Sequence, residues 1–376
     1  AERLTDCVRM RDLVGRLGGD EFGVLLLLDD PNEAGAAAEK ILHALAEPFT
    51  LEGREAFVSA SIGITIYPTD ATDPDTLLRY ADTAMYRAKD DGRNVCRYYT
   101  AEMNARAAER LDLETDLRRA LSQHEFLLDY QPKLDLATGA ISGIEALLRW
   151  RRPGGVGLAP PADFMPLLEE TGLIVPVGEW VIGEVCRQLR AWQHDGVQAV
   201  PIAVNLSARQ FHDENLPDKV MQSVREHGVS SELLEFEITE SSAMSSADQT
   251  AGILDVLRAA GARIAIDDFG TGYSSLTYLK RFPIDVIKID GAFVRDVTTD
   301  ADDAAIVLAI IGMAHQLGLR VVAEGVETVD QMSFLNAHGC DEIQGDVFSK
   351  PMDATKIAEL LRGDPSTARW EAAGAR

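Results

Sequence analysis

The chain of 376 residues carries 36 basic against 61 acidic residues, a formal net charge of −25, and 46% of its residues are hydrophobic. This length allows two domains at roughly 150 residues each. The acidic balance argues against non-specific binding to DNA, RNA or a membrane surface, all of which favour basic patches. A small phosphate ligand is still compatible with this charge, because bound metal ions can reverse the local sign.

Four cysteines lie far apart and form no CxxC pair: Cys7, Cys96, Cys186 and Cys340. This spacing predicts free thiols in a reducing compartment, and therefore a cytoplasmic location. The seven histidines show no HExxH spacing, which argues against a zinc site. No apolar run approaches the ~18 residues of a membrane span, and we expect no signal peptide within the sequence. Because the sequence starts without Met and in mid-pattern, we expect a fragment of a longer protein, with room for a membrane or sensor segment upstream.

Residues 1–99 form the first predicted unit, an alternation of strand and helix patterns. The expected elements, in chain order, are a β-hairpin turning at Gly18-Gly19 with its second strand over 22–28, a helix over 32–45, an alternating strand over 56–68 and a helix over 76–92 with Gly92 as its C-terminal cap.

Three stretches of this unit, RLGGDEFGVLL, SIGITIYP and ADTAMYRAKDDGRN, resemble the GGDEF (diguanylate cyclase) family in order and spacing. The resemblance covers the C-terminal half of that domain and includes the motif Gly18, Gly19, Asp20, Glu21 and Phe22. It implies that GTP or cyclic-di-GMP binds this unit and that Asp20 or Glu21 can bind metal. An earlier aspartate and a motif of the family that binds guanine are missing, so the cyclase site is incomplete. The unit is expected to be regulatory or to serve as a scaffold.

The family's inhibitory product site is an RxxD placed five residues before the GGDEF motif. Arg9 and Asp12 fit that pattern. The alternative is that these two residues form an ordinary surface pair.

Residues 100–123 contain many good helix formers and few breakers, which predicts a connecting helix. An ordinary surface helix of either neighbouring unit is the alternative. The second predicted unit covers residues 124–363, and residues 364–376 are expected to be a C-terminal tail.

The second unit alternates strand-like and helix-like segments, which favours a parallel α/β architecture. Eight candidate strands in about 240 residues predict a (β/α)₈ barrel. The first two strands are separated by ATGA alone, which suits a hairpin, so we expect a modified TIM-like barrel with one antiparallel strand. The expected strands lie over 125–136, 141–150, 200–207, 233–240, 263–270, 285–290, 320–327 and 342–349, with helices over 179–192, 249–260 and 303–317 among others.

Nearly every predicted strand ends in a carboxylate, an amide or an ammonium group. In a barrel the C-terminal strand ends surround one face, where such folds place their chemistry. Many acids on one face repel each other unless cations neutralise them, so the pattern predicts divalent metals with oxygen ligands. Taken singly, each residue has a plain structural alternative, such as a helix cap for Asn205 or a turn for Gln344. The strand-end residues are Glu145, Asn205, Glu237, Glu240, Asp267, Asp268, Lys288, Asp290, Glu324, Glu327 and Gln344.

The motifs EALLRW, NLSARQF, EITES, DDFGTGYSSLTYLKRFPIDVIKID, AEGVET and QG, in this order, are similar to the EAL-domain cyclic-di-GMP phosphodiesterases. The resemblance covers residues 112–362. It implies hydrolysis of one phosphodiester bond of cyclic-di-GMP to give linear pGpG, with two Mg²⁺ or Mn²⁺ ions as cofactors. A homodimer is a further expectation, and no DNA partner is implied.

The resemblance also implies a role for each matching residue. Glu145, Asn205, Glu237 and Asp267 would bind one metal ion, and Asp267, Asp268 and Glu324 the other. Lys288 would hold the attacking water, Glu324 would help to deprotonate it, and Glu240 would anchor the DDFGTGYS loop. The expected substrate contacts are Gln131, Arg149, Glu327 and Gln344.

One departure from the family pattern is Asp346, where an aromatic residue is usual. An acid at this position could repel the substrate phosphate or simply face the solvent. Two other functions compete with the phosphodiesterase: a receptor that binds cyclic-di-GMP without cutting it, and a different metal-dependent barrel enzyme of the enolase type.

Overall fold

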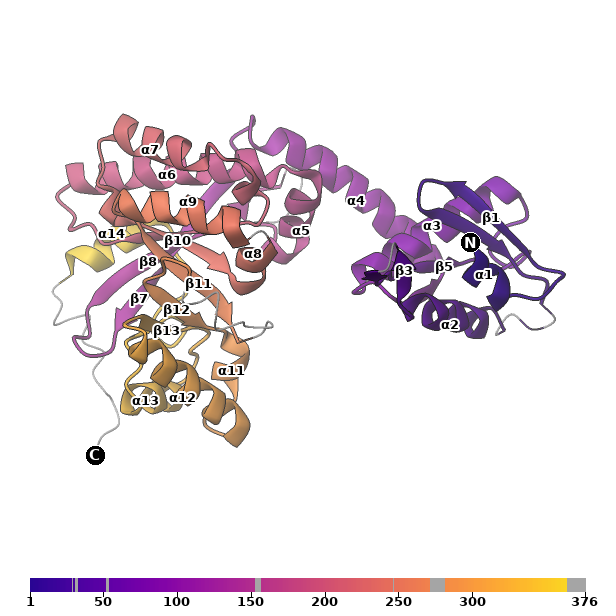
Figure 1. Cartoon of the computed structure of the whole chain (residues 1–376). Helices are drawn as coiled ribbons and strands as arrows, with labels where there is room; N and C mark the ends of the chain where they lie inside the picture. Colours follow the sequence, from indigo (N-terminus) through magenta and orange to yellow (C-terminus); the bar gives the residue numbers. More distant parts are fainter. Residues whose placement is uncertain are drawn as a thin grey trace. The chain divides into compact units, whose positions relative to one another are not determined.

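The computed structural model describes residues 1–28, 30, 33–51, 54–152, 157–245, 247–270 and 281–363 (Figure 1). The chain divides into two compact units, Ala1–Thr115 and Asp116–Arg376, which are described separately. The predicted C-terminal tail at 364–376 and residues 271–280 of the DDFGTGYS loop lie outside the described residues.

The first unit is an α/β arrangement built from short elements. Its elements are α1 (Glu2–Cys7), β1 (Leu13–Gly18), β2 (Glu21–Leu25), α2 (Glu33–Ala46), β3 (Phe49–Leu51), β4 (Arg54–Ala56), β5 (Ile62–Ile64), α3 (Pro74–Asp90) and β6 (Cys96–Tyr98). Among the described residues the strands form three pairs: β1 with β2 and β3 with β4 antiparallel, and β5 with β6 parallel.

The predicted hairpin at Gly18-Gly19 and both predicted helices of this unit are present. The strand expected over 56–68 is wrong in extent. Ala56 ends the separate short strand β4 and pairs with Phe49 of β3, and farther along only Ile62–Ile64 form a strand, which pairs with β6. Close packing explains the glycine in this strand. A Cβ on Gly63 would lie 1.9 Å from the backbone oxygen of Ala81, so glycine is what lets α3 rest directly on β5.

Helix α4 (Ala101–Ala120) contains the boundary between the two units. Its C-terminal end belongs to the second unit, where Leu117 and Ala120 are buried. Within the described part of the chain, no helix combines the length and apolar character needed to cross a membrane. The four cysteines carry free thiols.

In the second unit, eight strands of the described chain close into a barrel in the order β10-β11-β12-β13-β14-β7-β8-β9. All neighbours are parallel except at β7, which is antiparallel to both β8 and β14. The predicted modified TIM-like barrel with one antiparallel strand is thereby confirmed. The strands are β7 (Phe126–Asp135), β8 (Ile141–Trp150), β9 (Ile202–Leu206), β10 (Leu234–Thr239), β11 (Arg263–Phe269), β12 (Val286–Ile289), β13 (Arg320–Ala323) and β14 (Glu342–Ile343).

Helices surround these strands (Figure 1). They are α5 (Pro161–Thr171), α6 (Ile174–His194), α7 (Leu216–His227), α8 (Glu240–Ser245), α9 (Ala247–Ala259), α11 (Gly291–Arg295), α12 (Ala301–Gln316), α13 (Val329–Ala337) and α14 (Ala354–Arg362), with 3₁₀ turns η1 (Gln210–His212) and η2 (Ser231–Leu233). Side-chain caps fix several starts: Asp300 accepts from two backbone amides of α12, and Thr328 and Gln331 form a capping box on α13.

Alternation along the strands separates an apolar outer layer from the barrel interior. On β10, Leu234, Phe236 and Ile238 are all 0% exposed. Residues 235, 237 and 239 between them point the other way. Part of the interior is apolar as well, since Ala265, Val286 and Val322 from three adjacent strands form one buried cluster. The polar groups of the interior therefore stand on a packed layer rather than over an open pore.

Replacing Gly345 by alanine should destabilise the barrel. The added carbon would lie 2.2 Å from the backbone oxygen and 2.4 Å from the backbone nitrogen of Val326. That nitrogen also donates to Gln344 O at 3.1 Å, so the two loops cannot separate freely. Overpacking of this kind costs about 1–3 kcal/mol, and we expect the free energy of unfolding to fall by that amount. Urea unfolding followed by tryptophan fluorescence reports on the second unit, because every tryptophan lies in residues 150–370.

Gly252→Ala is the matched control. Gly252 lies within α9, and a Cβ there would meet nothing within 4 Å. Alanine stabilises a helix interior by about 1 kcal/mol relative to glycine, so this variant should be at least as stable as the parent. Equal stability of Gly345→Ala and the parent would contradict the close approach of the two loops.

Candidate functional site: a carboxylate cluster at the barrel mouth

The barrel brings most of the predicted strand-end residues to one mouth. Because parallel strands end on the same side, Glu145 of β8, Glu237 of β10 and Asp267 of β11 converge, joined by Glu324 just after β13. Asp290 is an exception, since its side chain accepts from the backbone of Ala292 at 2.8 Å and caps α11. The strand-end residue that contributes from β12 is therefore Lys288.

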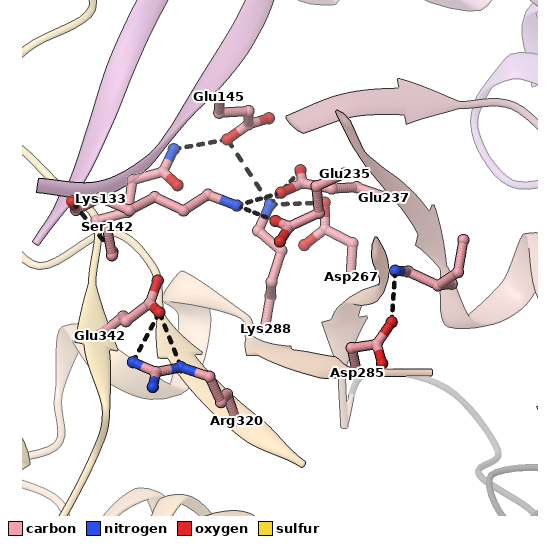
Figure 2. A network of polar contacts seen from close by, with 12 residues as sticks. Lys133, Ser142, Glu145, Glu235, Glu237, Asp267, Asp285, Lys288, Arg320 and Glu342 are labelled. Carbon is pink, nitrogen blue, oxygen red and sulfur yellow. Dashed lines mark hydrogen bonds and ion pairs between the residues drawn. The ribbon is translucent and has the colours of Figure 1, made fainter. Parts of the chain in front are cut away.

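Lys288 lies at the centre of these carboxylates and is 0% exposed. Its ammonium nitrogen is 2.6 Å from Glu237 Oε2 and 2.6 Å from Glu324 Oε1. It is also 3.2 Å from Asp267 Oδ2 and 3.7 Å from Glu145 Oε2. Figure 2 shows the side chain rising from β12 toward Glu145, Glu237 and Asp267.

A second buried ammonium group lies beside the first. Lys133 of β7 is 2.6 Å from Glu235 Oε1 and 2.7 Å from Glu237 Oε1. We call the inner cluster the set of two ammonium groups and six carboxylates that meet here. Its members are Lys133, Lys288, Glu145, Glu235, Glu237, Asp267, Asp268 and Glu324.

The protonation behaviour of the inner cluster follows from burial and charge. Burial alone would raise the pKa of Glu237, but Lys133 and Lys288 outweigh it and lower the pKa to about 2. For Glu145 burial dominates, helped by the charge of Glu237, and its pKa is raised. Burial raises the pKa of Glu324 to about 8 against the pull of Lys288. The cluster thus holds more carboxylates than its two ammonium groups can keep ionised.

The adjacent acids Asp267 and Asp268 point to one site although they are neighbours on a strand. Asp268 has a φ of +53°, in the left-handed region, which turns its side chain to the same side as that of Asp267. The register of β11 against β12 is interrupted after Ile266, where this distortion begins. As a result, carboxylate oxygens of Asp267, Asp268 and Glu324 lie within 4.8 Å of one another, a group able to hold a metal ion.

Three amides complete the mouth around Glu145. Asn205 Nδ2 donates to Glu145 Oε1 at 2.7 Å, and Gln344 Nε2 donates to Glu145 Oε2 at 2.6 Å. Gln344 also donates to Gln131 Oε1 at 3.1 Å. The side-chain oxygen Oε1 of Gln344 is buried and has no hydrogen-bond partner among the described residues. A buried, unpartnered acceptor beside the acidic cluster fits a site that binds a donor or a cation.

Glu240 lies immediately after β10, 3% exposed, and its Oε2 accepts from the backbone nitrogen of Gly270 at 3.3 Å. This contact reaches the first part of the DDFGTGYS loop. The predicted anchoring of the remainder concerns residues 271–280, outside the described chain.

A cavity of about 310 Å³ opens beside the inner cluster. Of the predicted substrate contacts, Gln131, Glu327 and Gln344 line it. Arg149 is not among its lining residues in the described chain and instead pairs with Asp129 at 2.9 Å. The lining residues are Gln131, Glu145, Glu324, Gly325, Glu327, Gln344, Gly345 and Asp346.

In the first unit, the GGDEF motif forms the turn of the β1–β2 hairpin, with Gly18 at the end of β1 and Glu21 at the start of β2. Arg9 and Asp12 do not pair through their side chains. Arg9 reaches Glu33 at 3.0 Å, and Asp12 accepts from the backbone of Arg9 and of Leu27. These backbone hydrogen bonds lower the pKa of Asp12. An inhibitory role for Arg9 and Asp12 stays a prediction.

Lys133 and Glu235 were missed by the sequence argument, which considered strand ends. A signal for both was present in the two-residue period of strands. Lys133 is two residues from Gln131, and Glu235 is two residues from Glu237. Each therefore faces the barrel interior like the predicted site residue next to it on that face of the strand.

Comparison with known families follows this division of the chain. Residues 114–351 match the family model described as EAL domain, and residues 1–95 match the one described as diguanylate cyclase, GGDEF domain.

Among curated relatives, the bifunctional diguanylate cyclase/cyclic di-GMP phosphodiesterase MucR of Pseudomonas aeruginosa is 47% identical over 95% of this chain and 52% of its own length. The cyclic di-GMP phosphodiesterase PdeR of Escherichia coli is 40% identical over 93% of this chain and 53% of its own. The chain therefore spans about half the length of these relatives. A solved structure titled PaMucR phosphodiesterase, c-di-GMP complex, is 48% identical, covering 65% of this chain and 99% of its own, with a TM-score of 0.63.

Removing the central ammonium should destabilise the metal-free barrel strongly. Lys288→Met leaves buried carboxylates without their main counter-charge, and breaking a buried ion pair from one side costs about 3–5 kcal/mol. We expect the free energy of unfolding, measured in urea with EDTA, to fall by that amount.

Lys219→Met is the control, because Lys219 also contacts two carboxylates, Glu179 at 2.5 Å and Asp213 at 2.7 Å, but is 41% exposed. Exposed pairs contribute about 0–1 kcal/mol. A loss of similar size in both variants would mean that the inner cluster does not depend on Lys288.

Proposed function

Since the chain belongs to the EAL domain family and carries a GGDEF portion ahead of the barrel, we propose that it hydrolyses cyclic-di-GMP to linear pGpG. One observation carries the proposal: carboxylates from four barrel strands and their end loops surround a buried lysine next to an open cavity. This is the arrangement that metal-assisted displacement at phosphorus requires.

The charges of the inner cluster support two divalent cations, Mg²⁺ or Mn²⁺. With all six carboxylates ionised, the two ammonium groups leave an excess of four negative charges, which equals the charge of two such ions. Hard oxygen donors suit both metals. We assign Glu145, Asn205, Glu237 and Asp267 to one ion and Asp267, Asp268 and Glu324 to the other.

When bound, such ions would lower the pKa of a water molecule and stabilise the charge that develops in an in-line displacement. The chain's own groups then have distinct tasks. Lys288 holds the attacking water, and the ionised carboxylate of Glu324 accepts its proton. The water oxygen bonds to phosphorus as one phosphodiester P–O bond breaks, and the leaving ribose oxygen takes a proton from solvent water to become a hydroxyl of pGpG. Glu240 fixes the backbone at Gly270.

Substrate recognition is assigned to the cavity and its rim. Gln131, Glu327 and Gln344 line the cavity and offer hydrogen-bond donors and acceptors to the dinucleotide. Arg149 would contact a substrate phosphate, for which the planar guanidinium is well suited. Its ion pair with Asp129 keeps it oriented on β8 until then.

The proposal extends to the regulation, cellular location and oligomeric state of the protein. We expect the GGDEF portion to regulate the barrel, with GTP or cyclic-di-GMP as its ligand, and the protein to act in the cytoplasm as a homodimer. The competing function is a receptor that binds cyclic-di-GMP without cutting it.

Product analysis separates the enzyme from the receptor. Purified protein with cyclic-di-GMP and Mg²⁺ or Mn²⁺ should release pGpG, and EDTA should stop the reaction. Glu145→Ala removes a metal ligand and should reduce turnover by at least about 10²-fold. The control Glu226→Ala changes an exposed residue of α7 and should leave the rate unchanged. Binding of cyclic-di-GMP without any pGpG would establish the receptor.

Asp346 is expected to weaken substrate binding without affecting the chemical step. It lines the cavity, and its nearest counter-charge, Lys350 at 3.6 Å, is 79% exposed. The repulsion between an exposed carboxylate and a phosphate is about 1 kcal/mol. Asp346→Asn should therefore lower KM about fivefold at low salt with kcat unchanged. Lys350→Met should raise KM instead. An unchanged KM in both variants would show that Asp346 faces solvent only.

A further inference from the structure

Lys133 is a buried ammonium group that the proposed reaction does not use. It comes from β7, is 2% exposed, and extends across the interior of the barrel to meet two residues of β10 (Figure 2). The facing residue on β8 is Gly143, so no side chain from that strand opposes it. Burying a charged lysine is costly, and here two carboxylates at 2.6 and 2.7 Å compensate it.

The two oxygens of Glu237 have different partners. Oε1 accepts from Lys133 at 2.7 Å, on the side of the barrel interior. Oε2 accepts from Lys288 at 2.6 Å, on the side of the mouth. A carboxylate with one oxygen held by a buried ammonium group cannot rotate freely, so its other oxygen keeps a fixed direction.

Glu235 explains why Lys133 stays in place. It lies two residues before Glu237 on the same strand, is 6% exposed, and accepts from Lys133 at 2.6 Å. Lys133 is therefore held by Glu235, which lies away from the mouth. Lys133 in turn holds Glu237, which faces the mouth.

We propose that Lys133, held by Glu235, is a positioning residue for Glu237, keeping Oε1 engaged so that Oε2 is directed at the divalent cation. The inference rests on the metal site of the proposed function and names a support for one of its ligands. Groups that orient metal ligands typically contribute 10–100-fold to metal affinity.

The main test uses a double variant that leaves the total charge unchanged. Lys133→Met/Glu235→Gln removes one positive and one negative charge together, so a change in metal affinity reports on the orientation of Glu237 rather than on the net field. We expect its affinity for Mn²⁺, measured by the electron paramagnetic resonance signal of the free ion, to fall about 10–100-fold. Glu235→Gln alone removes one negative charge but keeps a side-chain oxygen that can accept from Lys133. Lys133 then stays on Glu237, and Mn²⁺ affinity should remain within about threefold of the parent.

Lys133→Gln/Glu235→Gln is a second charge-neutral variant with a shorter, polar side chain, for use if the methionine variant does not fold by circular dichroism. Parent-like Mn²⁺ affinity in the folded double variant would overturn the inference. Equal losses in the double variant and in Glu235→Gln would also overturn it, because the pair would then act as ordinary core. Glu145→Ala is the reference: if it too binds Mn²⁺ like the parent, the metal site itself is wrong, and the proposed function fails with it.

Discussion

The second unit depends on one electrostatic constraint: its barrel mouth concentrates more buried carboxylates than buried cations. Lys288 contacts four of them and Lys133 a fifth, yet the six acids of the inner cluster exceed these two charges. Such a group is stable only where the surrounding backbone cannot relax, because separated carboxylates would simply rehydrate. A closed barrel with helices packed against its outer face provides that rigidity, and the buried aliphatic residues of β10 show how fully the outer layer is filled.

Much of this arrangement could be predicted because of a geometric property of parallel strands. Their C-terminal ends meet at one face, so a list of strand-end residues is already a list of neighbours. Glu145, Glu237 and Asp267 follow from that rule. The side-chain direction of Asp268 could not be predicted from that rule, since it depends on a left-handed backbone conformation that residue spacing does not reveal. Lys133 comes from the interior of an antiparallel strand that runs toward the opposite end, so its place among the acids depends on the barrel register between β7 and β8.

In the first unit, sequence motifs predict local structure better than they predict side-chain contacts. The GGDEF hairpin forms, and the absence of a side chain at Gly63 lets α3 pack directly on β5. The RxxD pattern, in contrast, specifies two residue types but not their partners. Arg9 forms an ion pair with Glu33 at the start of α2, and Asp12 accepts hydrogen bonds from two backbone amides. The amide of Arg9 lies within the motif, but Glu33 and the amide of Leu27 could not be read from its four positions, because only the folded unit brings those segments together.

The charge of the chain also constrains the order of events at the proposed site. Cyclic-di-GMP is an anion, and the cavity it would enter is lined by Glu145, Glu324, Glu327 and Asp346. When ionised, these acids repel a phosphate. The cavity would therefore bind the dinucleotide more tightly once divalent cations have neutralised the excess charge of the inner cluster. Metal and substrate binding are then thermodynamically linked, each favouring the other by the same factor. A residue that orients a metal ligand, as Lys133 does for Glu237, would in this way also affect substrate affinity without touching the substrate.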